Sequence, residues 1–206
     1  MYYTIRDDLR TEERKKRISD FIFTEVVLFV ILFMSVVIFL NTHVYFNVLV
    51  DGPSMEPTMY TGNVLKANRL KDVERGDIIV IDGVKKNTKG GYDWLIKRAI
   101  AFGGETVEIK DGKVYVDGKV QKEDYLPAGR QTWLDKNNKS QTLTLLVPEG
   151  HVFYLGDNRD NSTDSRHYGT CKESQVVGVV SDFALETRGV TKFFYQIGQF
   201  LRGDSD

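Results

Sequence analysis

The sequence predicts a mainly β protein, in which antiparallel sheets follow a single transmembrane helix. Three observations support this fold class. Residues 21–40 form an apolar run long enough to cross a bilayer. Beyond this run, short segments alternate apolar and polar residues with a period of two, which is typical of strands. Glycine, asparagine and aspartate separate these segments, as expected where tight turns join antiparallel strands.

The run from Phe21 to Leu40 contains one charged residue, Glu25, near its amino-terminal end. Twenty helical residues rise about 30 Å, the thickness of the hydrocarbon core. A cleavable signal peptide has a shorter apolar region and ends at a small-x-small site, which is absent here. A buried core helix would need a larger surrounding domain than this chain provides. We therefore predict a retained membrane anchor.

The charges flanking this run are asymmetric. No lysine or arginine follows it until Lys66, whereas the basic residues that precede it are Arg6, Arg10, Arg14, Lys15, Lys16 and Arg17. By the positive-inside rule, residues 1–20 form a cytoplasmic tail and residues 41–206 lie outside. The prediction is a single-pass protein of the cytoplasmic membrane, with membrane lipid as one partner.

The amino-acid composition argues against nucleic-acid binding, an internal disulfide and a metal site. The 206 residues include 28 basic and 29 acidic side chains, so charge gives no reason to expect nucleic acid as a partner. The single cysteine, Cys171, excludes an internal disulfide and is expected to be a small buried side chain. The three histidines, His43, His151 and His167, lack zinc-ligand spacing, so we predict no metal and no other cofactor.

Nine segments are expected to be strands: residues 44–50, 63–67, 77–82, 94–101, 106–110, 113–117, 143–147, 152–155 and 176–185. Asp111-Gly112 supplies the tight turn of the clearest hairpin. The aromatic-rich segment from Val190 to Leu201 has a helical period. It is expected to pack on the core or an edge; the alternative is an interfacial helix that rests on the bilayer.

Ser54, in Gly52-Pro53-Ser54-Met55-Glu56, stands shortly after the apolar run and is a candidate nucleophile. A serine hydroxyl must pass its proton to a base within hydrogen-bond reach. A Ser/His/Asp triad is disfavoured, because the segment has no GxSxG elbow and the histidines are poorly placed. A lysine can act as the base if burial lowers its pKa from about 10.4 by two units or more.

Lys97 lies in a strand-like segment, where alternation puts it on one face with Leu95, Ala99 and Ala101. Arg98 falls on the opposite face and needs a carboxylate partner there. On spacing alone, a solvated edge lysine is the simpler interpretation. The polar run from Gly156 to Arg166 is either a solvated loop or an ordered hydrogen-bond network.

Three segments together resemble the motif boxes of bacterial type I signal peptidases. They are Ser54-Met55-Glu56-Pro57-Thr58, Lys97-Arg98 followed by Gly103-Gly104-Glu105, and the run from Gly156 to Arg166. They occur in the same order and behind the same kind of anchor, and the agreement covers residues 21–185 in outline. The resemblance implies a signal-peptidase-like β catalytic domain with a small inserted lobe at roughly residues 106–148. It also implies a serine endopeptidase that removes signal peptides from exported preproteins after small residues at −1 and −3.

In this resemblance Ser54 is the nucleophile and Lys97 is the general base. Ser162 would hydrogen-bond the lysine amine and fix its direction. Some members of the family carry an oxyanion-binding serine two residues before the nucleophile, where this chain has Gly52. The oxyanion would therefore rely on backbone groups of Ser54 and Gly52. This glycine and the single anchor resemble the Gram-positive branch of the family.

The resemblance also assigns supporting roles. Asp164 would pair with Arg98 or Arg166 to brace the site. The shallow pockets for small substrate side chains would be lined by Met55, Leu95 and Ile96.

Two other functions remain open. One is a specialised Ser/Lys peptidase with a narrow substrate set, such as pilins, or one that cleaves itself as some repressors do. The other is a non-catalytic, membrane-anchored assembly chaperone of the same fold. The chaperone is disfavoured because it would normally have lost the serine or the lysine, and both are present.

Overall fold

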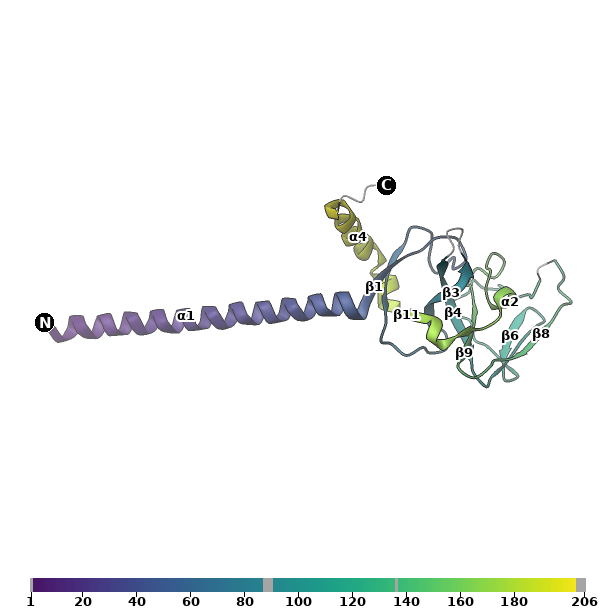
Figure 1. Cartoon of the computed structure of the whole chain (residues 1–206), viewed down its shortest axis with the longest axis horizontal. Helices are drawn as coiled ribbons and strands as arrows, with labels where there is room; N and C mark the ends of the chain where they lie inside the picture. Colours follow the sequence, from purple (N-terminus) through teal and green to yellow (C-terminus); the bar gives the residue numbers. More distant parts are fainter. Residues whose placement is uncertain (1, 87–90, 136, 203–206) are drawn as a thin grey trace. The chain divides into compact units, whose positions relative to one another are not determined.

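The computed structural model describes residues 2–86, 91–135 and 137–202. The chain forms two compact units, Met1–Val44 and Tyr45–Asp206. Figure 1 shows the first as a helix and the second as a β domain with short helices.

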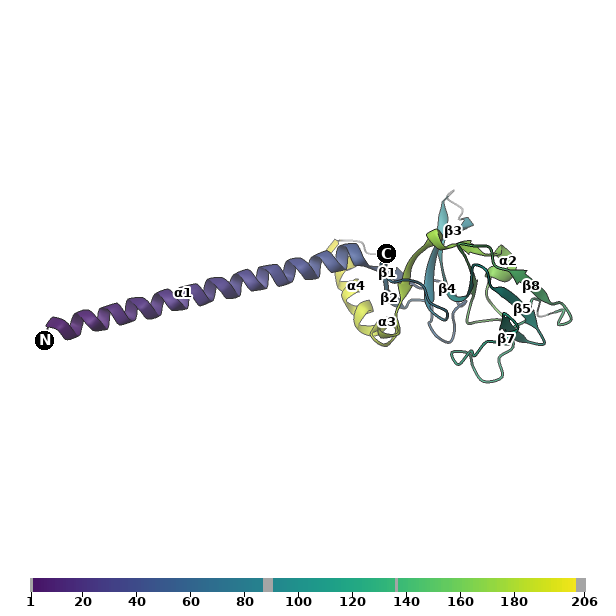
Figure 2. The same ribbon diagram turned by 90° about the horizontal axis from the view of Figure 1, so that it is seen from below.

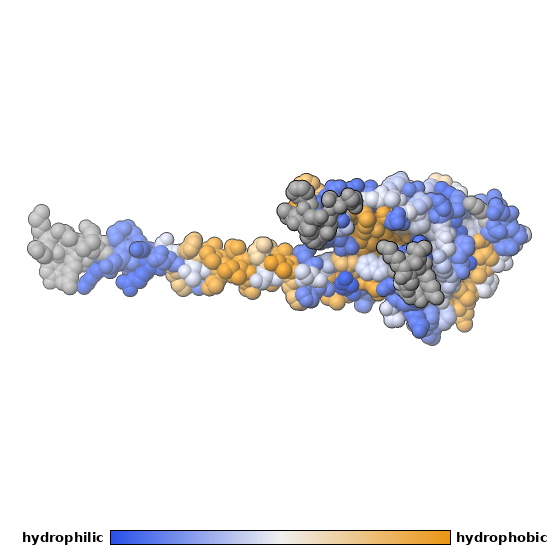
Figure 3. All heavy atoms as spheres, turned by 45° about the horizontal axis from the view of Figure 1, so that its top comes forward, coloured by the Kyte–Doolittle hydropathy of each residue, from blue (hydrophilic) through white to orange (hydrophobic). Residues whose placement is uncertain are grey.

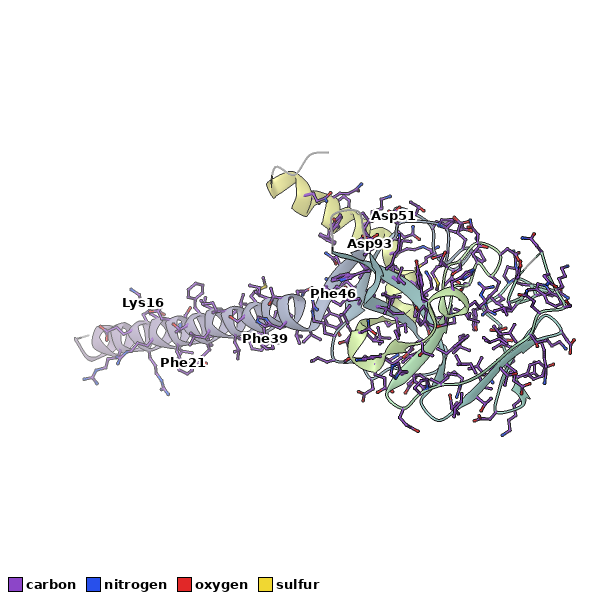
Figure 4. The ribbon with its side chains drawn as sticks, turned by 45° about the vertical axis from the view of Figure 1, so that its right-hand side comes forward. Lys16, Phe21, Phe39, Phe46, Asp51 and Asp93 are labelled. Atoms are coloured by element: carbon purple, nitrogen blue, oxygen red, sulfur yellow. The ribbon has the colours of Figure 1, made fainter. Side chains whose placement is uncertain are left out.

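The first unit is one continuous helix, α1 (Tyr2–Phe39), which continues into a π-helical turn, η1 (Leu40–Val44). It takes in residues 2–20, which belong to the predicted cytoplasmic tail. Figure 3 shows a polar segment of α1 followed by an apolar band, and Figure 4 places Lys16 before Phe21 and Phe39 along this helix. The segment Glu12–Val44 is long and apolar enough to cross a membrane. A cleavable signal sequence meets the same criteria, so its retention as an anchor stays a prediction.

The second unit contains two antiparallel sheets. The larger has seven strands in the order β1-β2-β11-β3-β4-β9-β10, and the smaller has four in the order β7-β6-β5-β8. The bounds of the larger sheet are β1 (Tyr45–Leu49), β2 (Val64–Asn68), β3 (Ile78–Lys86), β4 (Tyr92–Phe102), β9 (His151–Leu155), β10 (Cys171–Lys172) and β11 (Val176–Val180). Those of the smaller are β5 (Thr106–Lys110), β6 (Lys113–Val116), β7 (Lys119–Val120) and β8 (Leu143–Leu146). The predicted mainly β, antiparallel fold class is confirmed.

One predicted strand is too long. The segment 176–185 was expected to be extended throughout, but β11 ends at Val180 and a short helix, α3 (Asp182–Glu186), follows. Ser181 explains the change, because its carbonyl and its Oγ both accept from the Ala184 N–H, at 2.9 and 3.3 Å. Such capping by serine starts a helix. The remaining helices are α2 (Ser165–Tyr168), η2 (Glu173–Gln175) and α4 (Arg188–Arg202).

Three apolar clusters hold the second unit together. The first, called the Met55 cluster below, consists of Val48, Val50, Met55, Met59, Leu65, Ala67, Ile78, Val80, Val180 and Ala184, with Ile96 packed against it. The second joins the two sheets through residues of β4, β9, β5 and β6. The third includes Ile79, Leu95, Ala99 and Cys171. Cys171 is buried as predicted, and burial raises the pKa of its thiol to about 12.

The larger sheet curls strongly. Phe46 on β1 packs edge-to-face on Trp94 of β4, with 5.3 Å between ring centroids, although three strands lie between β1 and β4 in the sheet order. Figure 2 shows the smaller sheet at one end of the domain and α4 at the other, beside β1 and β2. The Met55 cluster therefore lies within the curled sheet.

Candidate active site

The side chains of Ser54 and Lys97 meet in the second unit. Ser54 lies in the loop between β1 and β2, and Lys97 lies near the middle of β4. Lys97 Nζ is 2.8 Å from Ser54 Oγ and donates to the carbonyl oxygen of Ile96, also at 2.8 Å. The two residues are thus in hydrogen-bond contact, as a nucleophile and its base need to be.

Lys97 is not a solvated edge residue, because β4 lies between β3 and β9 and Lys97 is only 3% exposed. Burial lowers the pKa of its amine from 10.5 to about 8, although the carboxylates of Asp164 and Asp157 partly oppose this shift. A buried ammonium loses hydration, which favours the neutral amine. A large fraction of Lys97 can therefore be neutral in mildly alkaline solution.

The run from Gly156 to Arg166 is an ordered network that holds the nucleophile loop. The Asn158 backbone N–H donates to the Ser54 carbonyl at 3.0 Å, and its Nδ2 donates to the Pro53 carbonyl at 3.1 Å. Gly156 lies so close that an added Cβ would come within 2.5 Å of the Ser54 carbonyl oxygen and 2.1 Å of Ser162 Oγ. Only glycine permits this approach.

Ser162 lies beside the site without the expected hydrogen bond. Arg98 pairs with Leu155 across β4 and β9, so continuing that register by one residue places Gly156 opposite Lys97. Ser162 Oγ lies against Gly156 and is shielded from solvent, and within the described residues no hydrogen bond joins it to Lys97. Its role in orienting the lysine amine therefore stays a prediction.

Arg98 pairs with Asp157, and this corrects the alternative in which it pairs with Asp164. Its Nε and Nη2 donate to the two carboxylate oxygens of Asp157 at 2.8 and 2.6 Å. Thr58 Oγ1, four residues after the nucleophile, donates to Asp157 Oδ2 at 2.5 Å. Both charged residues are buried, at 7% and 0% exposure. Asp157 thus joins the nucleophile loop to the strand of the base, a role that the sequence did not indicate.

Asp164 pairs with Arg166, the other partner that the sequence allowed. Nε and Nη2 of Arg166 donate to its two oxygens, each at 2.9 Å, and the Gly156 N–H donates at 3.0 Å. Burial alone would raise the pKa of Asp164, but these hydrogen bonds and the charge of Arg166 outweigh it and lower the pKa. Asp164 therefore remains an anion that supports the end of β9.

Two of the three predicted pocket residues lie together. Met55 and Ile96 share the Met55 cluster, whereas Leu95 belongs to the cluster on the other face of β4. The difference follows from strand alternation, which sends Leu95 and Ile96 to opposite faces. The other members of the Met55 cluster were missed because they come from strands far apart in the sequence.

The backbone N–H of Gly52 already makes a hydrogen bond within the protein. Its N–H donates to Thr61 Oγ1 at 3.1 Å, so it does not point freely toward a substrate oxygen. Within the described part of the chain, the Ser54 N–H donates to no acceptor. Of the two predicted oxyanion groups, the Ser54 N–H is the one available in this conformation. A nucleophile, a buried amine and a backbone donor together suit acyl transfer.

Comparisons with known proteins show which family the chain resembles in sequence. The family model described as signal peptidase, peptidase S26, matches residues 23–184. Signal peptidase I V of Bacillus subtilis is 40% identical over 149 residues, which cover 68% of this chain and 85% of the relative. Signal peptidase IB of Staphylococcus aureus is 32% identical over 182 residues, covering 81% and 89%. A crystal structure of a signal peptidase I from Enterococcus faecalis is 36% identical, covers 54% of this chain and 98% of that one, and has a TM-score of 0.44.

Proposed function

Since this chain belongs to the S26 family of signal peptidases, which are serine endopeptidases, we propose that it cleaves signal peptides from exported preproteins with a Ser/Lys dyad. Ser54 is the nucleophile and Lys97 the general base. The observation that carries the assignment is the 2.8 Å separation of Lys97 Nζ and Ser54 Oγ at a lysine with only 3% exposure. Cleavage follows small residues at −1 and −3 of the preprotein.

In acylation, the neutral amine of Lys97 accepts the hydroxyl proton of Ser54 while Oγ attacks the scissile carbonyl carbon. The negative charge that develops on the carbonyl oxygen is stabilised by the Ser54 N–H. When the tetrahedral intermediate collapses, the C–N bond breaks and the Lys97 ammonium returns the proton to the leaving amine. The mature protein leaves, and the signal peptide remains as an ester on Ser54.

In deacylation, Lys97 is neutral again and accepts a proton from a water molecule, whose oxygen attacks the ester carbonyl. The second tetrahedral intermediate expels Ser54 Oγ, which recovers its proton from Lys97. The amine needs a constant direction in both steps, and its hydrogen bond to the Ile96 carbonyl supports this. Ser162 is the second orienting group, once its hydroxyl turns toward the amine during the reaction.

The proposal also covers how the substrate binds and how the chain is oriented in the membrane. The signal peptide lies extended along a sheet edge, and the Met55 cluster shapes the shallow pockets for the small side chains. Residues 1–20 are cytoplasmic, residues 21–40 span the membrane, and residues 41–206 lie outside, with a lobe at roughly 106–148. The charge asymmetry around the span supports this orientation.

The test uses the full chain in detergent with a purified preprotein. Lys97→Ala and Ser54→Ala should each abolish cleavage, whereas the control Lys113→Ala, at an exposed position of β6, should cleave normally. Circular dichroism and thermal unfolding check that each variant is folded. Full activity of folded Lys97→Ala would refute the dyad.

The alternatives give different results. An acylating penem should add its mass at Ser54, which a non-catalytic chaperone would not allow. A narrow-substrate peptidase would leave most secreted proteins processed after depletion of this chain, whereas a general signal peptidase would leave many precursors.

A further inference from the structure

The carboxy-terminal helix α4 (Arg188–Arg202) exposes its apolar side and turns a polar side toward the protein. Four apolar residues at helical spacing are 59%, 59%, 65% and 40% exposed: Val190, Phe193, Phe194 and Ile197. They are called the α4 stripe below. The half-buried residues of this helix are instead Thr191, Tyr195, Gly198 and Gln199. A helix that only covers a water-soluble domain buries its apolar side, whereas the α4 stripe is left uncovered by the part of the chain that the structure describes.

The helix is nevertheless attached to the catalytic domain. It contacts β2, and Arg188 Nη1 donates to the Thr58 carbonyl at 3.4 Å. Lys192 Nζ lies 3.9 Å from the point that a Cβ at Gly62 would occupy. Both contacts are made with the loop that carries Ser54. The orientation of the α4 stripe is thus fixed relative to the candidate active site rather than left to a free tail.

We propose that the α4 stripe inserts into the interfacial region of a lipid bilayer and seats the catalytic domain on the membrane. Two observations select lipid as the occupant. β2, on which α4 packs, pairs along its length with β1, and β1 begins at Tyr45, directly after the membrane-span candidate Glu12–Val44. The helix also carries three basic and no acidic residues, which complements anionic headgroups.

The S26 match ends at residue 184, before α4 begins. The helix therefore lies outside the region of this chain that the family model matches. Its basic residues Arg188 and Lys192 lie on the side of the helix opposite the α4 stripe, and helices that lie in the plane of a membrane interface likewise carry basic residues on their polar face.

The test locates α4 by fluorescence quenching in the full chain. In a Cys171→Ala background, the environment-sensitive dye NBD is attached at Phe194→Cys, in the α4 stripe, or at Gln196→Cys, an exposed polar position of the same helix. Each protein is reconstituted into vesicles of phosphatidylcholine and phosphatidylglycerol that contain acyl-chain spin-labelled lipid. The dye at 194 should be blue-shifted and strongly quenched, and the dye at 196 clearly less so.

Equal, weak quenching at both positions would overturn the proposal. A blue shift at 194 without quenching by the lipid would also overturn it, because a protein surface such as a second copy would then cover the stripe. A second variant adds Phe193→Glu to the chain labelled at 194 and should reduce its quenching, whereas Gln196→Glu should not. Unfolding curves establish that these surface variants are folded. The measurement does not depend on catalysis, so its failure is separate from failure of the proposed peptidase activity.

Discussion

Replacing Lys97 by methionine should abolish hydrolysis and still stabilise the fold at neutral pH. The reason is that burial lowers the pKa of this amine from 10.5 to about 8, so the folded state disfavours the charged form. Because the pKa of Lys97 is lower in the folded state than in the unfolded state, the charged amine lowers the free energy of unfolding. This cost is fully present below pH 8. It disappears as the pH rises from 8 toward 10.5.

The magnitude follows from the size of this shift. At about 1.36 kcal/mol per pKa unit, the full cost is about 3 kcal/mol, and it falls by about 2.5 kcal/mol between pH 7 and pH 10. Methionine also removes the hydrogen bonds to Ser54 Oγ and the Ile96 carbonyl, a loss of about 1 kcal/mol each that does not vary with pH. The variant should be more stable than the parent by about 1 kcal/mol at pH 7 and less stable at pH 10.

The assay is guanidinium unfolding of the full chain in mild detergent, followed by tryptophan fluorescence at several pH values. The quantity compared is the difference in free energy of unfolding between variant and parent. Lys113→Met, at an exposed position, is the matched control and should give a difference that is constant with pH. If the Lys97→Met difference is also constant between pH 7 and pH 10, then Lys97 is not held neutral by burial and the proposed base is wrong.

Three further outcomes are expected. For a soluble peptide substrate, kcat/KM should rise with pH and level off above about pH 8, as the amine of Lys97 loses its proton; a plateau already reached below pH 6 would contradict this base. Asp157→Asn leaves the Arg98 guanidinium buried without its anion and should lower the free energy of unfolding by about 3 kcal/mol, whereas the exposed control Asp124→Asn should change it little. Cys171 is 1% exposed with a thiol pKa of about 12, so iodoacetamide at pH 8 should label it only after unfolding, and rapid labelling of folded protein would show that the site opens.

The sequence identified Ser54 and Lys97 but could not give their separation. They are 43 residues apart in the chain, and their contact depends on the register of β4 between β3 and β9. The local sequence around Lys97 suits a solvated edge as well as a core strand. Its burial is decided by the position of β4 inside the sheet, which is a property of the whole topology. The fold class, in contrast, followed from local patterns: the long apolar run, the period-two alternation and the turn residues between the strands.

The sequence could not tell which aspartate pairs with which arginine. Asp157 and Asp164 occur in one short run, and either could reach an arginine. The end of β9 at Leu155 decides between them, because it puts Asp157 next to Arg98 and leaves Asp164 for Arg166. The strand predicted at 176–185 was too long for a similar reason, because local sequence did not decide where it ends. Apolar residues continue past Val180 with spacing that suits a strand or a helix, and a single capping residue, Ser181, selects the helix.

The Asp157 carboxylate also has a mechanical consequence. With the first unit anchored in a membrane, as proposed, tension on the anchor would enter the second unit at Tyr45, nine residues before Ser54. The antiparallel pairing of β1 with β2 resists it in shear. Beyond that pairing, Asp157 binds Thr58 and Arg98 at once, so the nucleophile loop and the strand of the base are displaced together. In the proposed anchored state, this coupling would keep the distance between Ser54 Oγ and Lys97 Nζ constant while the bilayer moves.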